Sequence, residues 1–159
     1  MKTIFLMLLL TFYSFSSFSQ IQDCLNLETP SVGTRCLTSK GYFFLRLENS
    51  WQDEGEGGKQ WFDKVEPIDM GKHTKATDKC AARNLTLPTV ADYQLAIAHG
   101  FEEAIKPFSK YNQCWWTSSI VYTADGFAHT YCYSKYDVLK GYITYYGRGT
   151  PLQYTCVNP

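Results

Sequence analysis

The sequence predicts an α+β domain that is exported and cross-linked by disulfides. Three observations carry this prediction: an apolar leader at the N-terminus, six cysteines that all lie after it, and a change from helical to strand patterns along the chain. Of the 159 residues, about 140 remain after the leader, a usual size for one domain with one core.

The first twenty residues have the pattern of a secretory signal peptide. Lys2 precedes an apolar run over residues 4–10, and Ser17-Phe18-Ser19 supplies a small-x-small cleavage pattern. We therefore predict a signal peptide over residues 1–19 and a secreted or periplasmic protein. A membrane span needs about 20 apolar residues. No segment of the chain is that long, so the protein is not expected to span a membrane.

Residues 20–50 are expected to form an N-terminal disulfide loop and a first strand. Pro30 and Gly33 mark the turn of the loop, and residues 42–47 have the composition of a strand. The glycine-rich acidic segment 52–58 is expected to be a solvated surface loop. Its acidic side chains could instead supply oxygen ligands to calcium, which is the less favoured interpretation; they are Asp53, Glu54 and Glu56.

Two short helices are expected in the middle of the chain. The first covers residues 77–83 and turns Cys80 inward. The second begins with a capping box, in which Thr89 and Asp92 satisfy free backbone amides, and ends near Gly100. Its apolar face consists of Val90, Tyr93, Ala96 and Ile97.

From residue 113 onward the pattern changes to strands and turns. Strands are predicted over residues 114–121, 127–133, 141–146 and 152–157, with a turn at Ala124-Asp125-Gly126. A strand, two helices and several further strands predict the α+β class. Residues 51–159 are expected to form the core, in a single domain with residues 20–50.

The cysteines predict disulfides rather than a metal site. An even number in an exported chain indicates three bonds, although six cysteines allow fifteen pairings. Separation along the chain favours two short loops and one long one without choosing between pairings. Zinc is disfavoured, because no Cys-x-x-Cys and no cysteine and histidine at zinc-ligand spacing occur. No metal and no cofactor are expected.

Charge and composition narrow the range of partners. Lysine plus arginine and aspartate plus glutamate number 15 each, and no basic stripe is present, so a nucleic acid is not an expected partner. The chain has 12 tyrosines, 10 phenylalanines and 4 tryptophans. Such aromatic residues suit either an ordinary core or a surface that binds sugars or proteins.

Four motifs in the later part of the chain point to one family. They are Cys80 on a first helix, Leu87-Pro88-Thr89 before a second, Trp115-Trp116-Thr117-Ser118-Ser119 as a central strand, and the terminal Tyr154-Thr155-Cys156-Val157. Together with Trp61-Phe62-Asp63 and Ala76-Thr77, they resemble the bacterial C-type-lectin-like family over residues 51–157. The resemblance implies a C-type-lectin-like fold, with two short helices and a curved, mostly antiparallel sheet stapled by disulfides. Members of the family act as adhesion or recognition modules.

The resemblance also implies a disulfide pattern. In these domains a cysteine on the first helix pairs with one on the last strand, and an inner pair staples the later sheet. Carried over to this chain, the pairs are Cys80 with Cys156 and Cys114 with Cys132, which leaves Cys24 with Cys36 as an N-terminal addition.

The chain departs from the lectins of this fold that bind sugar through calcium. Those use a Glu-Pro-Asn or Gln-Pro-Asp loop and a Trp-Asn-Asp strand. Here Glu66-Pro67-Ile68 lies in another region, and Trp-Asn-Asp is absent. Any sugar binding is therefore expected to be independent of calcium.

Catalysis is the less favoured hypothesis. Disulfide-bonded cysteines exclude a thiolate mechanism. His73, His99 and His129 are scattered, with no His-Glu-x-x-His pattern, and are expected to be surface or capping residues. Carboxylates for glycoside cleavage would have to come from Glu102, Glu103, Asp125 or Asp137.

The resemblance places the recognition surface within residues 119–151. If Ile143 faces the core, strand alternation turns Tyr145 the same way, and Tyr142, Thr144 and Tyr146 away from it. Of the neighbours Trp115 and Trp116, one is expected in the core and the other along a groove. The candidate ligand-binding residues are Trp116, Tyr136, Tyr142, Tyr146 and Arg148. The tyrosines would stack on a sugar ring or cover a protein, and the arginine would bind a carboxylate or glycan oxygen.

Two hypotheses about function follow from these residues. The first is a non-catalytic recognition module, such as an adhesin, that binds surface carbohydrate or cell-envelope glycan. The second is a protein-binding module, such as an inhibitor of an envelope enzyme.

Overall fold

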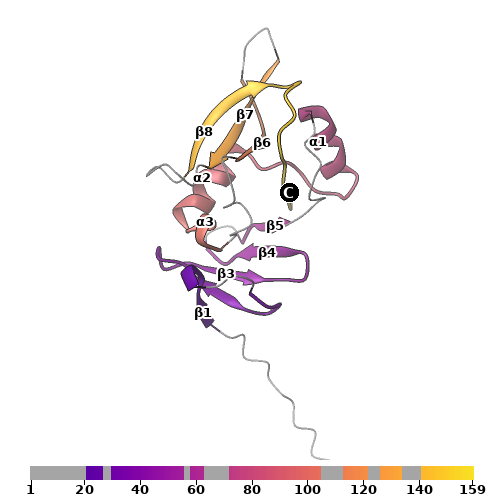
Figure 1. Ribbon diagram of the computed structural model, residues 1–159. Helices are drawn as coiled ribbons and strands as arrows, with labels where there is room; N and C mark the ends of the chain where they lie inside the picture. Colours follow the sequence, from indigo (N-terminus) through magenta and orange to yellow (C-terminus); the bar gives the residue numbers. More distant parts are fainter. Residues whose placement is uncertain are drawn as a thin grey trace, which may run out of the picture.

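The computed structural model describes residues 21–26, 30–55, 58–62, 72–104, 113–121, 126–133 and 141–159. These residues form an α+β fold with three helices and two sheets, mostly antiparallel (Figure 1). None of the described helices has the length and apolar character needed to cross a membrane. The expected signal peptide over 1–19 and most of the expected turn at Ala124-Asp125-Gly126 lie outside the described residues.

The larger sheet has six strands in the order β1-β2-β3-β4-β5-β9. The strands are β1 (Ile21–Asp23), β2 (Arg35–Leu37), β3 (Phe43–Arg46), β4 (Ser50–Asp53), β5 (Gln60–Phe62) and β9 (Cys156–Val157). Only β1 and β2 pair in parallel. Trp61 of β5 lies opposite Val157 of β9, so the first and last described strands, β1 and β9, belong to one sheet and form its two edges.

The structure differs from the predicted strands of this sheet in three places. The strand predicted over 42–47 is confirmed as β3, but the predicted surface loop 52–58 is wrong at its start, because Gln52 and Asp53 belong to β4. The strand predicted over 152–157 shortens to β9. Strands β1, β2 and β5 have three residues each, too few to show an alternating pattern.

The two predicted helices are present. Helix α1 (His73–Ala81) begins four residues earlier than expected and ends before Asn84, whose φ of 57° stops the helical path. Helix α2 (Val90–Ala98) has the predicted capping box. Asp92 N donates to Thr89 Oγ1 at 3.0 Å, and Thr89 N donates to Asp92 Oδ2 at 2.7 Å.

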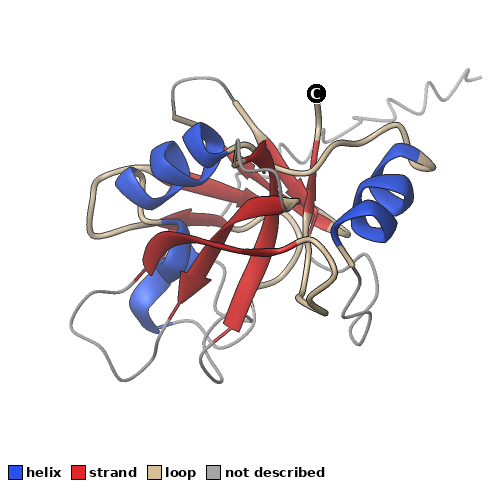
Figure 2. Cartoon of the chain, turned by 90° about the horizontal axis from the view of Figure 1, so that it is seen from above, coloured by secondary structure: helices blue, strands red, loops and turns tan. Residues whose placement is uncertain are grey.

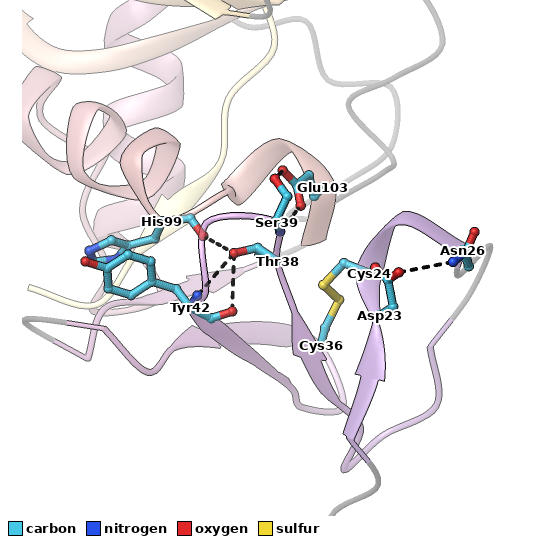
Figure 3. The surroundings of a disulfide bond; sticks show 9 residues. All are labelled: Asp23, Cys24, Asn26, Cys36, Thr38, Ser39, Tyr42, His99 and Glu103. Atoms are coloured by element: carbon cyan, nitrogen blue, oxygen red, sulfur yellow. Dashed lines mark hydrogen bonds between the residues drawn. A yellow bond between two sulfur atoms is a disulfide. The ribbon is translucent and has the colours of Figure 1, made fainter.

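A third helix, α3 (Phe101–Ala104), follows Gly100. Gly100 has a φ of +88°, and a Cβ there would lie 2.5 Å from Cβ of Thr38. Thr38 Oγ1 donates to the main-chain O of His99 at 2.6 Å, and Ser39 donates to the carboxylate of Glu103 (Figure 3). The N-terminal segment is thus docked on the junction of α2 and α3.

The smaller sheet has three antiparallel strands in the order β6-β7-β8. They are β6 (Gln113–Ile120), β7 (Phe127–Tyr133) and β8 (Gly141–Gly147). Figure 2 shows helices on both sides of the strands. Helix α1 lies against β6, and α2 lies against β6 and β7.

Two clusters of buried side chains stabilise the fold, one on each face of the smaller sheet. The first joins the larger sheet, α2 and α3 to one face; within it the ring centroids of Trp61 and Phe101 are 4.5 Å apart, and Tyr93 stacks on Tyr131 at 4.7 Å. The second joins α1 and β9 to the other face around Trp116. Both faces of this sheet are therefore packed near its centre.

Three disulfides tie these parts together. Cys24 is bonded to Cys36, Cys80 of α1 to Cys156 of β9, and Cys114 of β6 to Cys132 of β7. These are the three pairs expected from the sequence.

Candidate functional site

Strand β8 carries the most exposed aromatic surface among the described residues. Tyr142, Tyr145 and Tyr146 are 47%, 59% and 39% exposed. Within the described sheet β8 pairs with β7 alone, and Figure 1 shows it along the outer side of that sheet. The strand from Gly141 to Gly147 contains no charged residue. An uncharged tyrosine surface of this kind suits stacking on an apolar ring face.

The register with β7 divides the tyrosines between the two faces of the sheet. Tyr142 lies opposite Cys132 and Tyr146 opposite Ala128, so these two tyrosines share one face. Ile120 of β6, 54% exposed, is also opposite Ala128 and extends this face across the sheet. Tyr142 and Tyr146 are four residues apart, or about 13 Å along a strand, a spacing that can serve more than one sugar ring.

Tyr145 shares a face of the strand with Ile143, as alternation predicts, but it is not buried there. Ile143 packs against the first buried cluster, as expected, and Tyr145 lies on the same face of the strand. Tyr145 is nevertheless exposed, and its ring lies nearly perpendicular to that of Phe127 at a centroid distance of 5.8 Å. The packing that covers Ile143 therefore stops before Tyr145.

The expectation that Trp116 contacts a ligand is also wrong. Trp116 is 0% exposed and Trp115 is 4% exposed. The two rings point to opposite faces, as predicted, but each face has its own buried cluster. Neither tryptophan lines a groove.

Arg148 follows β8 directly and is half-buried. Its main-chain N donates to Gly126 O at 2.8 Å, and its O accepts from His73 N at 3.0 Å. These bonds fix the residue between β7 and α1. Its Nε is buried and has no hydrogen-bond partner among the described residues.

Several expected site residues lie outside the described part of the chain. They are the candidate ligand contact Tyr136, the carboxylates Asp125 and Asp137, and Glu56 of the acidic loop. Tyr136 therefore remains a sequence prediction.

Two of the three histidines, His73 and His99, are buried, so neither is a surface residue. His99 is the C-cap of α2, which fits the predicted capping role, and its ring is buried. Its Nδ1 lies 2.7 Å from Oδ2 of Asp53, also buried, and the ring of Tyr42 stacks on the imidazole at 3.9 Å. The expectation that Asp53 is solvated is therefore wrong as well. This pair joins β4 to the end of α2.

His73 is the other buried histidine. Its Nε2 lies 2.9 Å from Thr117 O, and its ring meets Trp116 edge-on at 5.2 Å. Burial lowers the pKa of this imidazole, since desolvation penalises its charged form. The hydrogen bond to Thr117 raises the pKa and the positive charge of Arg148 lowers it, and the net shift is downward. A neutral His73 donates from Nε2 to the carbonyl, which positions α1 on β6.

The carboxylates that the less favoured catalytic hypothesis would need are engaged in hydrogen bonds where the structure describes them. Glu102 accepts a hydrogen bond from Tyr131 Oη at 2.7 Å, and Glu103 accepts from Ser39. No group of three or more histidine, cysteine, aspartate or glutamate side chains in the described ranges is arranged to hold a metal ion.

The sequence indicated Tyr142 and Tyr146 but missed Tyr145 and Ile120. Alternation along a strand gives the face of a side chain, whereas exposure depends on what packs over that face. The one local signal was the absence of charge from residues 141–147.

The chain matches no protein-family model, no curated protein and no solved structure.

Proposed function

We propose that this protein is a secreted, non-catalytic recognition module that binds surface carbohydrate or cell-envelope glycan without calcium. The observation that carries the proposal is the exposed tyrosine face of β8, formed by Tyr142 and Tyr146 on an uncharged strand. Tyrosine rings stack on the apolar faces of sugars, and Arg148 beside the strand supplies a donor to a glycan oxygen or carboxylate.

The C-type-lectin-like assignment belongs to this proposal. Its support is the pairing of a cysteine on α1 with one on β9, together with the inner pair between β6 and β7. Three disulfides also fit a protein that folds in an oxidising compartment.

A glycan array tests the proposal, run with and without a calcium chelator. The expected result is binding of a defined set of saccharides that the chelator leaves unchanged and that Tyr142→Ala or Tyr146→Ala weakens at least about tenfold, an effect of 1.4 kcal/mol. Leu95→Ala is the matched control, because it removes an exposed apolar side chain from α2 instead.

Three results would overturn the proposal. Silence on all glycans with stable capture of a protein would support the protein-binding hypothesis. Turnover of peptidoglycan or glycan substrates by the purified protein would support an enzyme. Unchanged binding by both tyrosine variants would place the glycan site elsewhere.

A further inference from the structure

The main chain of β8 has a free side within the described structure. Arg148 N donates to Gly126 O at 2.8 Å, which continues the β7–β8 ladder one pair beyond Phe127 and Gly147. Main-chain groups alternate in direction along an antiparallel strand. Since Arg148 points its amide toward β7, residues 142, 144 and 146 do the same, and Ile143 and Tyr145 point theirs away.

This free side lacks the usual protection of outer strands. Natural outer strands carry charges, prolines or bulges that prevent pairing with another chain. Strand β8 has seven residues, with no charge and no proline, and pairs with β7 in continuous register. Tyr142 and Tyr146 on one face and Tyr145 on the other are each more than a third exposed, so the described residues leave both faces of the strand partly open at these positions.

The sequence of β8 favours pairing of its free side with the same strand of a second copy of the chain. Residues 141–147 read Gly-Tyr-Ile-Thr-Tyr-Tyr-Gly, almost the same in both directions about Thr144. Antiparallel pairing of two copies therefore places glycine on glycine and Tyr142 on Tyr146, with Thr144 on Thr144 at the two-fold axis. In this register Ile143 faces Tyr145 of the second copy, and both have outward main-chain groups, as a hydrogen-bonded pair requires.

We propose that the protein forms a two-fold dimer by antiparallel pairing of β8 with β8 of a second copy. The two three-stranded sheets become one six-stranded sheet. Tyr142 and Tyr146 of both copies then lie on a single continuous face. The dimer follows from the strand alone and does not depend on glycan binding, but it would double the tyrosine surface offered to a ligand.

Charge substitution at the two-fold axis tests the dimer. Directly opposed side chains on one face lie close together, and like charges there repel. In sedimentation velocity of the mature protein, the wild type is expected to change from monomer to dimer as its concentration rises to about 1 mM. Thr144→Lys and Thr144→Glu should each remain monomeric, and an equimolar mixture of the two should recover the dimer.

A matched control separates this effect from a general effect of charge. Val32→Lys adds the same charge at a position that is 64% exposed, in the N-terminal segment, and should dimerise like the wild type. Circular dichroism checks that each variant is folded. A wild type that stays monomeric throughout, or a Thr144→Lys protein that dimerises unchanged, overturns the proposal. A mixture that fails to dimerise also overturns it. The monomeric variants should still bind glycan. Loss of dimerisation can therefore be told apart from loss of glycan binding, which is the test of the proposed function.

Discussion

Strands β6 and β7 and their neighbour β8 are built from similar aromatic residues but have different environments. Trp116 of β6 and Tyr131 of β7 are 0% exposed, whereas the three tyrosines of β8 are 39% to 59% exposed. Strands β6 and β7 have packed clusters on both faces, whereas the described residues cover β8 mainly through its pairing with β7 and the packing at Ile143. Both β6 and β8 end the three-stranded sheet, so the packing over each face, rather than residue type or position in the sheet, decides which aromatic side chains stabilise the fold and which are available to a partner.

The disulfides likewise hold β6 and β7 but not β8. Removing them is expected to have the largest effect on the free energy of unfolding. Cys80 with Cys156 and Cys114 with Cys132 hold α1, β9, β6 and β7, and no disulfide reaches β8. Replacing Cys80 and Cys156 together by alanine should lower the free energy of unfolding by up to about 4.5 kcal/mol, and replacing Cys114 and Cys132 by up to about 3 kcal/mol, because the first bond closes the longer loop. Guanidinium denaturation measures both, and a larger loss from the shorter loop would contradict this ranking.

Truncation of aromatic side chains compares the two environments directly. Trp116→Ala should lower the free energy of unfolding by about 3 to 5 kcal/mol, because it leaves a cavity in the second buried cluster. Tyr145→Ala removes a side chain that is 59% exposed and should change stability by no more than about 0.5 kcal/mol. Urea denaturation of both variants checks the difference. Equal losses would mean that β8 is as firmly packed as β6.

Removal of single hydroxyl groups makes a finer comparison. Tyr131→Phe deletes the donor of the 2.7 Å hydrogen bond to Glu102 and should cost about 1.5 to 3 kcal/mol, the usual range for a bond to a charged group. The control is Tyr145→Phe on β8, which should be neutral. If both variants were neutral by thermal denaturation, the bond to Glu102 would not stabilise the fold.

The smallest expected effect is a pH dependence at His73. Because burial lowers the pKa of this histidine in the folded protein below its ordinary 6.5, the unfolded chain binds more protons between those two values. Stability should therefore fall as the pH drops below about 6.5. His73→Gln should flatten the slope, and Lys72→Gln, at the exposed neighbour, should not. Urea denaturation across this pH range is the measurement, and an unchanged slope in His73→Gln would assign the effect to another group.

The sequence predicted features that are local or covalent. The α+β class, the capping box at Thr89 and the three disulfide pairs follow from spacing, composition and a family resemblance. It did not predict β1, β2, β5 or α3, because three or four residues show no periodicity. It also did not predict that Trp116 is buried and Tyr145 exposed, because alternation gives the face of a strand and not what covers that face. The buried pair of His99 and Asp53 joins residues 46 positions apart, a contact that no local pattern could indicate.

The central claim is that the tyrosines of β8 are accessible while those in the buried clusters are not. Nitration of tyrosines by tetranitromethane, read out by mass spectrometry, tests this claim most directly. Tyr142, Tyr145 and Tyr146 should react quickly. Tyr93 and Tyr131, both 0% exposed, should be protected; burial also raises the pKa of Tyr93 well above its usual value and so disfavours the reactive phenolate. A bound glycan should slow the reaction of Tyr142 and Tyr146. Modification of Tyr131 as fast as Tyr146, or no effect of a bound glycan on β8, would contradict the account.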